Sequence, residues 1–594
     1  MTRRTSRMAT ITMALMLAVG ASWSQIPPPG PPAFQPAPGP GGPGAFAPAP
    51  VAAPTSLDQA LVTIVVGDLG GAIEGAGSVA GQVLAGMDGP GLKALVGARL
   101  GDPTLAGMPV GAGLAVVVFP GNMRATYLEV APEQSASYAT ALQREGQFVG
   151  QASDLLVAAP DELAMKAGTA LAGEVKSRLL SGPPKPTVKA TVHLDRLLAM
   201  VEPMIQMMLP GAGMMIAQQL NLMQGGAQDL PAVQSNAVVW DAALRGSYSI
   251  AKQLRQLEVE IGAPQEGIRI DTLLRATDGS NLQQFFAAQT VPAGAGDLLK
   301  ILPGRGAVRF RFGYNMDALT SLVEKELTPI LAAAPMGEEQ KQAALAVIRK
   351  GIEVRGDAFA GDFMIPGQPL WSGSGISRPK DPGSILARVE EMVNEMSDGG
   401  GFLSFGAAST TVTLAKNVRE HQGIAIHQIL VRQDMGALGA ELAGPMREMM
   451  GDLRADFAIV DDLVLVAIGP RLMEELIDAA KAKAHPQARP LNAEQAFGAG
   501  ANGYMDFDLP AYMTLVVRMM TMGKPSADQF APLQTMVDML KGAPPVSAAL
   551  FLGPEGARGG MLAPRGLIDK AAQAVLTLNA ARAKETGAKT APSP

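Results

Sequence analysis

The 594-residue chain contains no cysteine. This absence excludes disulfide bonds, cysteine nucleophiles, thiolate zinc sites, iron–sulfur clusters and lipid anchors attached through cysteine. Histidine is also scarce, with four residues, and neither an HExxH motif nor a clustered acidic calcium loop is present. We therefore expect no metal site and no cofactor.

Aromatic residues make up only 4% of the chain, which is little for a sugar-binding groove or a base-stacking surface. The formal net charge is −6, and loss of Arg3, Arg4 and Arg7 with a cleaved leader would take it to −9. Nucleic acids and anionic membrane surfaces attract basic patches. The mild acidity therefore predicts no nucleic-acid partner.

Motifs that carry catalysis are missing as well. The chain has no GxxxxGK[ST] motif, no GxGxxG between an expected strand and an expected helix, and no GxSxG turn for a nucleophilic serine. Gly373-Ser374-Gly375 lacks that spacing, and we interpret it as a loop. A hydrolase with a dispersed active site stays an alternative, but the sequence favours a protein without enzymatic activity.

The N-terminus has the features of a secretory signal peptide. The three arginines precede an apolar stretch from Ala9 to Ala21, and Ser22-Trp23-Ser24 places small residues before Gln25. We expect cleavage after residue 24, export to the periplasm or the extracellular space, and no membrane span in the mature chain.

A proline- and glycine-rich linker is expected at residues 25–54, because this composition favours extended chain over a packed core. At the other end, residues 584–594 are expected to form a disordered polar tail.

Between these ends a unit recurs, consisting of an alternating strand, an aspartate and an amphipathic helix. The three clearest copies contain Asp195, Asp317 and Asp508, and a weaker copy contains Asp68. An aspartate at such a position accepts hydrogen bonds from the free N–H groups of the first helical turn. We therefore assign Asp195, Asp317 and Asp508 a structural, helix-capping role.

A larger repeat contains this unit and predicts two homologous lobes, residues 55–292 and 305–583. Asp154–Pro160 resembles Asp462–Pro470, and each lobe ends in two strands joined by a turn and followed by a helix. Hairpins with flanking helices indicate an α+β fold, in which each lobe is a mainly antiparallel sheet with helices packed on one face.

Methionine is unusually frequent, with 33 residues. Seven lie in and just before an uncharged stretch, and they form a candidate apolar binding surface: Met200, Met204, Met207, Met208, Met214, Met215 and Met223. Core packing, an adaptable surface for a lipid, peptide or protein, and Cu(I) binding by thioethers are the three interpretations.

We expect an exported, non-enzymatic binding or scaffold protein of the cell envelope, with a protein, peptide or lipid as its partner. The alternatives are a carrier of lipids or hydrophobic peptides that uses the methionine-rich helices, and a periplasmic hydrolase.

Overall fold

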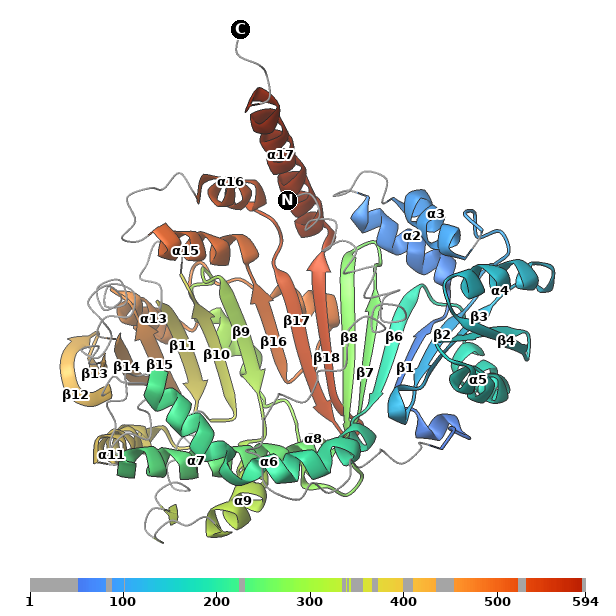
Figure 1. The fold of residues 1–594 in the computed structure, drawn as a ribbon. Coiled ribbons are helices and arrows are strands. Elements are labelled where there is room, and N and C mark those ends of the chain that lie inside the picture. Colours follow the sequence, from blue (N-terminus) through green and yellow to red (C-terminus); the bar gives the residue numbers. More distant parts are fainter. Residues whose placement is uncertain are drawn as a thin grey trace. The chain divides into compact units, whose positions relative to one another are not determined.

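The computed structural model describes residues 52–81, 88–100, 102–223, 230–333, 338, 341–342, 356–365, 372–398, 410–433, 453–521 and 530–589. The expected signal peptide and nearly all of the expected linker lie outside these residues. In the described part, helices and antiparallel strands alternate, which confirms a mixed helix-and-strand protein built on a large antiparallel sheet (Figure 1).

Contacts divide the chain into two compact units. The first contains residues up to 193 together with 258–270, and the second contains residues 194–257 and 271 onward. This division differs from the predicted lobe boundaries, because the segment after residue 193 belongs with the second unit.

In the described part of the first unit, strands pair in the order β4-β5-β3-β2-β1-β6, all antiparallel. These strands are β1 (Val62–Val66), β2 (Leu114–Val118), β3 (Arg124–Glu129), β4 (Phe148–Ala152), β5 (Leu155–Ala159) and β6 (Thr187–His193). Its helices are α2 (Leu69–Ala80), α3 (Gly89–Arg99), α4 (Ser135–Arg144) and α5 (Glu162–Val175). The hairpin of β7 (Leu254–Gly262) and β8 (Gly267–Ala276) contributes residues 258–270.

Helices cover both faces of this sheet, so the prediction of helices on one face is wrong. Leu171 and Val175 of α5 pack with Tyr127 and Val157 on one side. Residues of α2, α3 and α4 pack with Leu128 and Leu156 on the other side. All five residues of β5 are buried. An uninterrupted apolar strand of this kind must be covered on both faces.

In the described part of the second unit, strands pair in the order β12-β13-β14-β15-β11-β10-β9-β16-β17-β18, all antiparallel. Along the chain they are β9 (Val308–Gly313), β10 (Ala358–Phe363), β11 (Gly373–Arg378), β12 (Thr410–His421), β13 (Ile424–Gln433), β14 (Leu453–Val460), β15 (Leu463–Ile468), β16 (Gly503–Phe507), β17 (Val546–Gly553) and β18 (Gly556–Pro564). The interpretation of Gly373-Ser374-Gly375 as a loop is therefore wrong, since these residues begin β11.

Helices of the second unit are α6 (Leu194–Met223), α7 (Leu230–Ala251), α8 (Asn281–Ala287), α9 (Met316–Ala333), α11 (Ile385–Asp398), α13 (Leu472–Ala482), α14 (Asn492–Phe497), α15 (Leu509–Thr521), α16 (Ala531–Leu540) and α17 (Arg565–Lys589). The main core of this unit packs α13, α14 and the short helix η6 (Ala295–Lys300) against one sheet face. On the opposite face, α11 covers strands β12 to β15. Because α17 continues to Lys589, residues 584–589 of the predicted tail are helical.

The order of strand pairing in the first unit recurs in the second. Pairings β1–β2, β2–β3, β3–β5, β4–β5 and β1–β6 correspond to β9–β10, β10–β11, β11–β15, β14–β15 and β9–β16. The hairpin β12–β13 has no counterpart in this scheme and extends the second sheet beyond β14.

Two fully buried tyrosines of the first unit give a matched stability prediction. The Tyr138 hydroxyl donates to Asp102 Oδ2 at 2.7 Å, whereas the Tyr127 hydroxyl has no partner among the described residues. Burial opposes ionisation of Asp102, but hydrogen bonds from Gly107, Tyr138 and Thr104 outweigh it and lower its pKa to about 2. Tyr138→Phe should therefore lower the free energy of unfolding by about 1–3 kcal/mol. Tyr127→Phe should leave it unchanged or raise it slightly, and equal losses in urea unfolding would contradict this account.

Candidate functional site

Strand β9 directs two kinds of side chain to opposite faces of the second sheet. Its sequence VRFRFG alternates, so Phe310 and Phe312 share one face and Arg309 and Arg311 share the other. The two arginines are buried, whereas the two phenylalanines are only half-buried. This reverses the usual distribution of charged and apolar residues.

The face of β9 that carries Phe310 and Phe312 continues onto the neighbouring strands, as the pairing of residues between strands shows. Phe312 lies opposite Phe359 of β10, and Phe310 lies opposite Met505 of β16. Met505 in turn lies opposite Ala548 of β17, which lies opposite Met561 of β18. Paired residues of antiparallel strands share a face. We call this surface the apolar sheet face and define it by Phe310, Phe312, Phe359, Phe363, Met505 and Met561.

The rings of this face form one cluster. Phe310 lies 5.8 Å from Phe363 in a stacked arrangement, and Phe312 lies 5.4 Å from Phe359. Glycines in the adjacent strands make room for them. A Cβ atom at Gly373 would come within 2.3 Å of the Phe363 ring, and one at Gly503 within 2.4 Å of Phe312. The rings therefore lie low over glycine backbone and form a broad apolar floor.

The apolar sheet face is more exposed to solvent than the part of the opposite face that packs in the main core. Met505 and Met561 are 36% and 41% exposed, and the four phenylalanines are half-buried. On the opposite face, Tyr504 and Ala360 are fully buried in the main core. Among the described residues, no core cluster covers the middle of the apolar sheet face.

Helices bound this face at both ends of β17. Leu552 packs with Leu282 and Phe286 of α8. Val546 packs in a cluster with residues of α15, α16 and α17. Figure 1 shows α15 and α16 at one end of these strands and α8 at the other. Ala548 and Leu550 lie between the two covered ends.

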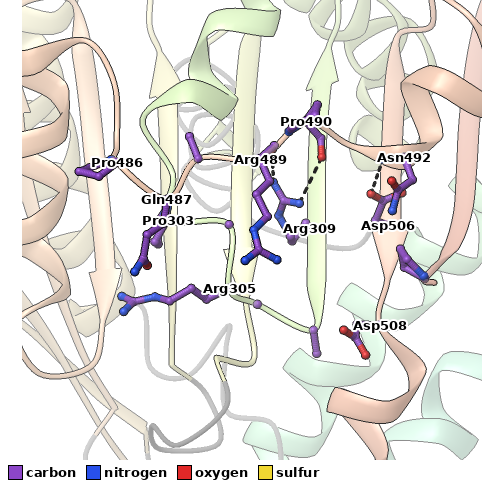
Figure 2. Close-up of a pocket in the computed structure, with 15 residues that line it drawn as sticks. Pro303, Arg305, Arg309, Pro486, Gln487, Arg489, Pro490, Asn492, Asp506 and Asp508 are labelled. Carbon is purple, nitrogen blue, oxygen red and sulfur yellow. Dashed lines mark hydrogen bonds between the residues drawn. The ribbon is translucent and has the colours of Figure 1, made fainter. Parts of the chain in front are cut away.

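The arginine face carries a polar cavity of about 920 Å³ where the segment before β9 meets the loop after α13 (Figure 2). Arg309 lies opposite Asp362 and Asp506 in the sheet register and donates to the carbonyl oxygens of Arg489 and Pro490. Burial raises the pKa of both carboxyl groups, although backbone N–H donors and Arg309 oppose the shift. Burial also lowers the pKa of Arg309, against the effect of the two aspartates.

The predicted methionine surface is largely displayed. On α6, Met200, Met204, Met207, Met208 and Met215 are 53–81% exposed. Met214 is half-buried against Ala217 and Ala237, and the side chain of Met223 lies outside the described residues. The helix bends by 65° between Leu209 and Gly211, where φ is +95°.

The three aspartates assigned as caps differ in position. Asp508 accepts from Ala511 N at 2.9 Å at the start of α15. For Asp317 the capping role is corrected, because Asn315 Oδ1 accepts from Ala318 N and Asp317 pairs with Lys380. Asp195 lies inside the first turn of α6 rather than before it, and its carboxylate accepts from Arg196 N, so it does not hold the predicted capping position.

Sequence reasoning missed the apolar sheet face, although the alternation of arginine and phenylalanine in β9 was a usable signal. Within the described residues, no group of three or more His, Asp or Glu side chains could hold a metal ion. In that same part of the chain, no single helix is long and apolar enough to cross a membrane. Taken together, the two arms of the bent helix, Leu194–Leu209 and Gly211–Gln219, have the length and apolar composition of a membrane span.

The fold and the site together define an α+β protein with a large antiparallel sheet, one face of which is apolar and partly open. No family model matches the chain, and neither the curated proteins nor the solved structures contain a significantly similar one.

Proposed function

We propose that this chain is an exported binding protein of the cell envelope and that its apolar sheet face holds an acyl chain. One observation carries the proposal: four half-buried phenylalanines and two exposed methionines share one face of adjacent strands, opposite the residues of the main core. Contiguous apolar surface of this kind marks binding sites in soluble proteins.

An acyl chain suits this surface better than a peptide does. Strands β9, β16 and β17 are each paired on both sides, so their backbone N–H and C=O groups are already bonded within the sheet. An extended peptide laid on this face would bury its own backbone groups without partners. A hydrocarbon chain has no such groups, and each CH₂ removed from water contributes about 0.8 kcal/mol.

The expected export of the chain fits this proposal. Residues 1–24 have the features of a signal peptide, and the linker at 25–54 would separate the folded part from a surface. A lipid that crosses an aqueous compartment needs a protein to shield its acyl chain. The absence of catalytic motifs in the sequence agrees with carriage rather than turnover.

A second candidate function is docking of a partner protein on α6. Met200, Met204, Met207 and Met208 fall within about 100° of the helix circumference, and all are more than half exposed. Flexible methionine side chains adapt to amphipathic helices of different shape. An anionic membrane surface is a less suitable partner for α6 than a protein is. Helices that lie on such membranes carry Lys and Arg, and none occurs between residues 203 and 228.

We also propose that the two lobes arose by duplication. The recurring order of strand pairing supports this, and so do the sequence similarities between residues 154–160 and 462–470. In the first unit the corresponding sheet is covered on both faces. The apolar sheet face would then be a specialisation of the second copy.

Native mass spectrometry with lipid extraction, on the mature chain from its own exported fraction, tests the proposed function. A co-purifying molecule with an acyl chain, at up to one copy per protein, is the expected result. A mass equal to the protein alone, after both gentle purification and incubation with lipid extract, would contradict it.

A further inference from the structure

The cavity on the arginine face is a second place where a ligand could bind, and it is independent of the acyl-chain proposal. Its walls come from the segment before β9, the loop between α13 and α14, and the ends of β16 and β17. Four prolines stiffen these walls: Pro303, Pro486, Pro490 and Pro545. A volume of about 920 Å³ is in the range of pockets that hold organic molecules rather than single ions.

Three arginines line this cavity, and they are held in different ways (Figure 2). Arg309 is fixed by the carbonyl oxygens of the 489–490 turn. Arg305 pairs with Glu475 at 2.6 Å near the surface. Arg489 is exposed and has no ion pair among the described residues. The cavity therefore contains a guanidinium without a counter-ion, close to a second, buried guanidinium.

The two carboxylates that line the cavity do not neutralise Arg489. Asp506 accepts from Asn492 N, Ala493 N and the Ser547 hydroxyl at 2.6–3.0 Å. Asp508 accepts from Ala511 N at the start of α15. Both carboxylates are thus engaged by backbone donors at helix starts, which leaves the Arg489 side chain available.

We propose that this cavity binds a small organic oxyanion, a carboxylate or a phosphate ester, through Arg489. The planar guanidinium presents paired donors that match the oxygens of either group. Arg309 holds the loop that carries Arg489, and the proline walls fit the apolar part of the ligand.

Isothermal titration of the full chain with citrate and with glycerol 3-phosphate tests this site, with sodium chloride at equal ionic strength as the blank. At least one probe should bind, and Arg489→Gln should weaken its binding tenfold or more. The variant keeps the backbone carbonyl that receives Arg309, so the loop should stay in place. Arg144→Gln, an exposed change on α4, serves as the matched control and should bind like the wild type.

Binding of citrate alone would assign a carboxylate ligand, and binding of glycerol 3-phosphate alone a phosphate ester. No heat above the chloride blank, or equal affinity in the wild type and Arg489→Gln, would overturn the proposal. The acyl-chain measurements do not enter this test, because the two sites lie on opposite faces of β9.

Discussion

Replacement of Glu326 by alanine is expected to lower the free energy of unfolding of the second unit by about 3–5 kcal/mol. This carboxylate is buried in α9 and accepts from Ser249, Gln253 and Asn281 at 2.6–2.7 Å. These donors come from α7, the turn after it and α8. Alanine would remove the carboxylate acceptor from all three half-buried donors. Among the described residues, only Gln253 would keep another acceptor, the Ser249 carbonyl oxygen at 3.4 Å.

Glu326→Gln is the matched control. Its Oε1 can still accept from Gln253 and Asn281, and its amide can donate to the Ser249 hydroxyl, because a hydroxyl also accepts. We expect a loss of less than about 1.5 kcal/mol, from removal of the charge alone. Urea unfolding of both variants checks this pair, and similar losses in both would contradict a hydrogen-bonding role.

The same carboxylate predicts a pH dependence. Burial opposes its ionisation, but hydrogen bonds from Ser249, Asn281 and Gln253 outweigh this and lower the pKa of Glu326. A lowered folded-state pKa stabilises the protein above the unfolded-state value of about 4.3. That stabilisation is lost as the pH falls through the lower folded-state pKa. The loss should be smaller in Glu326→Gln than in the wild type.

The second large effect concerns the apolar sheet face. The double variant Met505→Lys, Met561→Lys should weaken binding of a fluorescent fatty acid by a hundredfold or more. Each ammonium group would have to be desolvated beneath the acyl chain, which costs several kcal/mol. Both positions are exposed, so the variant should fold with little loss of stability.

Met204→Lys, Met207→Lys is the matched control, since it makes the same change at exposed positions of α6. We expect it to bind the fatty acid like the wild type. Loss of binding in this control, with binding retained in the sheet variant, would contradict binding at the apolar sheet face and place the acyl chain on the methionines of α6.

The architecture was predictable where a pattern is local. The buried strand at 155–159 and the hairpin strands near 257–274 and 546–563 stand out from apolar runs and turn residues. Proline and glycine at 210–211 marked the bend of α6. Each of these features depends on neighbours in the sequence.

Strands β10 and β11 were not predictable in this way. Gly373 and Gly375 weaken the strand pattern, and glycine in a strand usually indicates a loop or bulge. Glycine is needed at position 373 because of the neighbouring strand β10. The ring of Phe363 in that strand occupies the space that a side chain at Gly373 would need. A single sequence does not show which strands will be neighbours.

The low aromatic content of the chain likewise hid the apolar sheet face from a prediction based on sequence. An average of 4% argues against an aromatic surface, yet four of the seventeen phenylalanines lie together on β9 and β10. The methionines from Met200 to Met215 lie on α6, but sequence alone could not tell whether their side chains are displayed. Composition gives the amount of a residue type, and the strand register determines where it gathers.

The most direct test of the acyl-chain proposal is photo-cross-linking of the full mature chain with a diazirine-bearing fatty acid, followed by peptide mapping. We expect labelled peptides from β9, β16 and β18, around Phe310, Met505 and Met561, and competition by unlabelled fatty acid. Labelling confined to α6, or labelling that unlabelled fatty acid does not reduce, would contradict binding at the apolar sheet face.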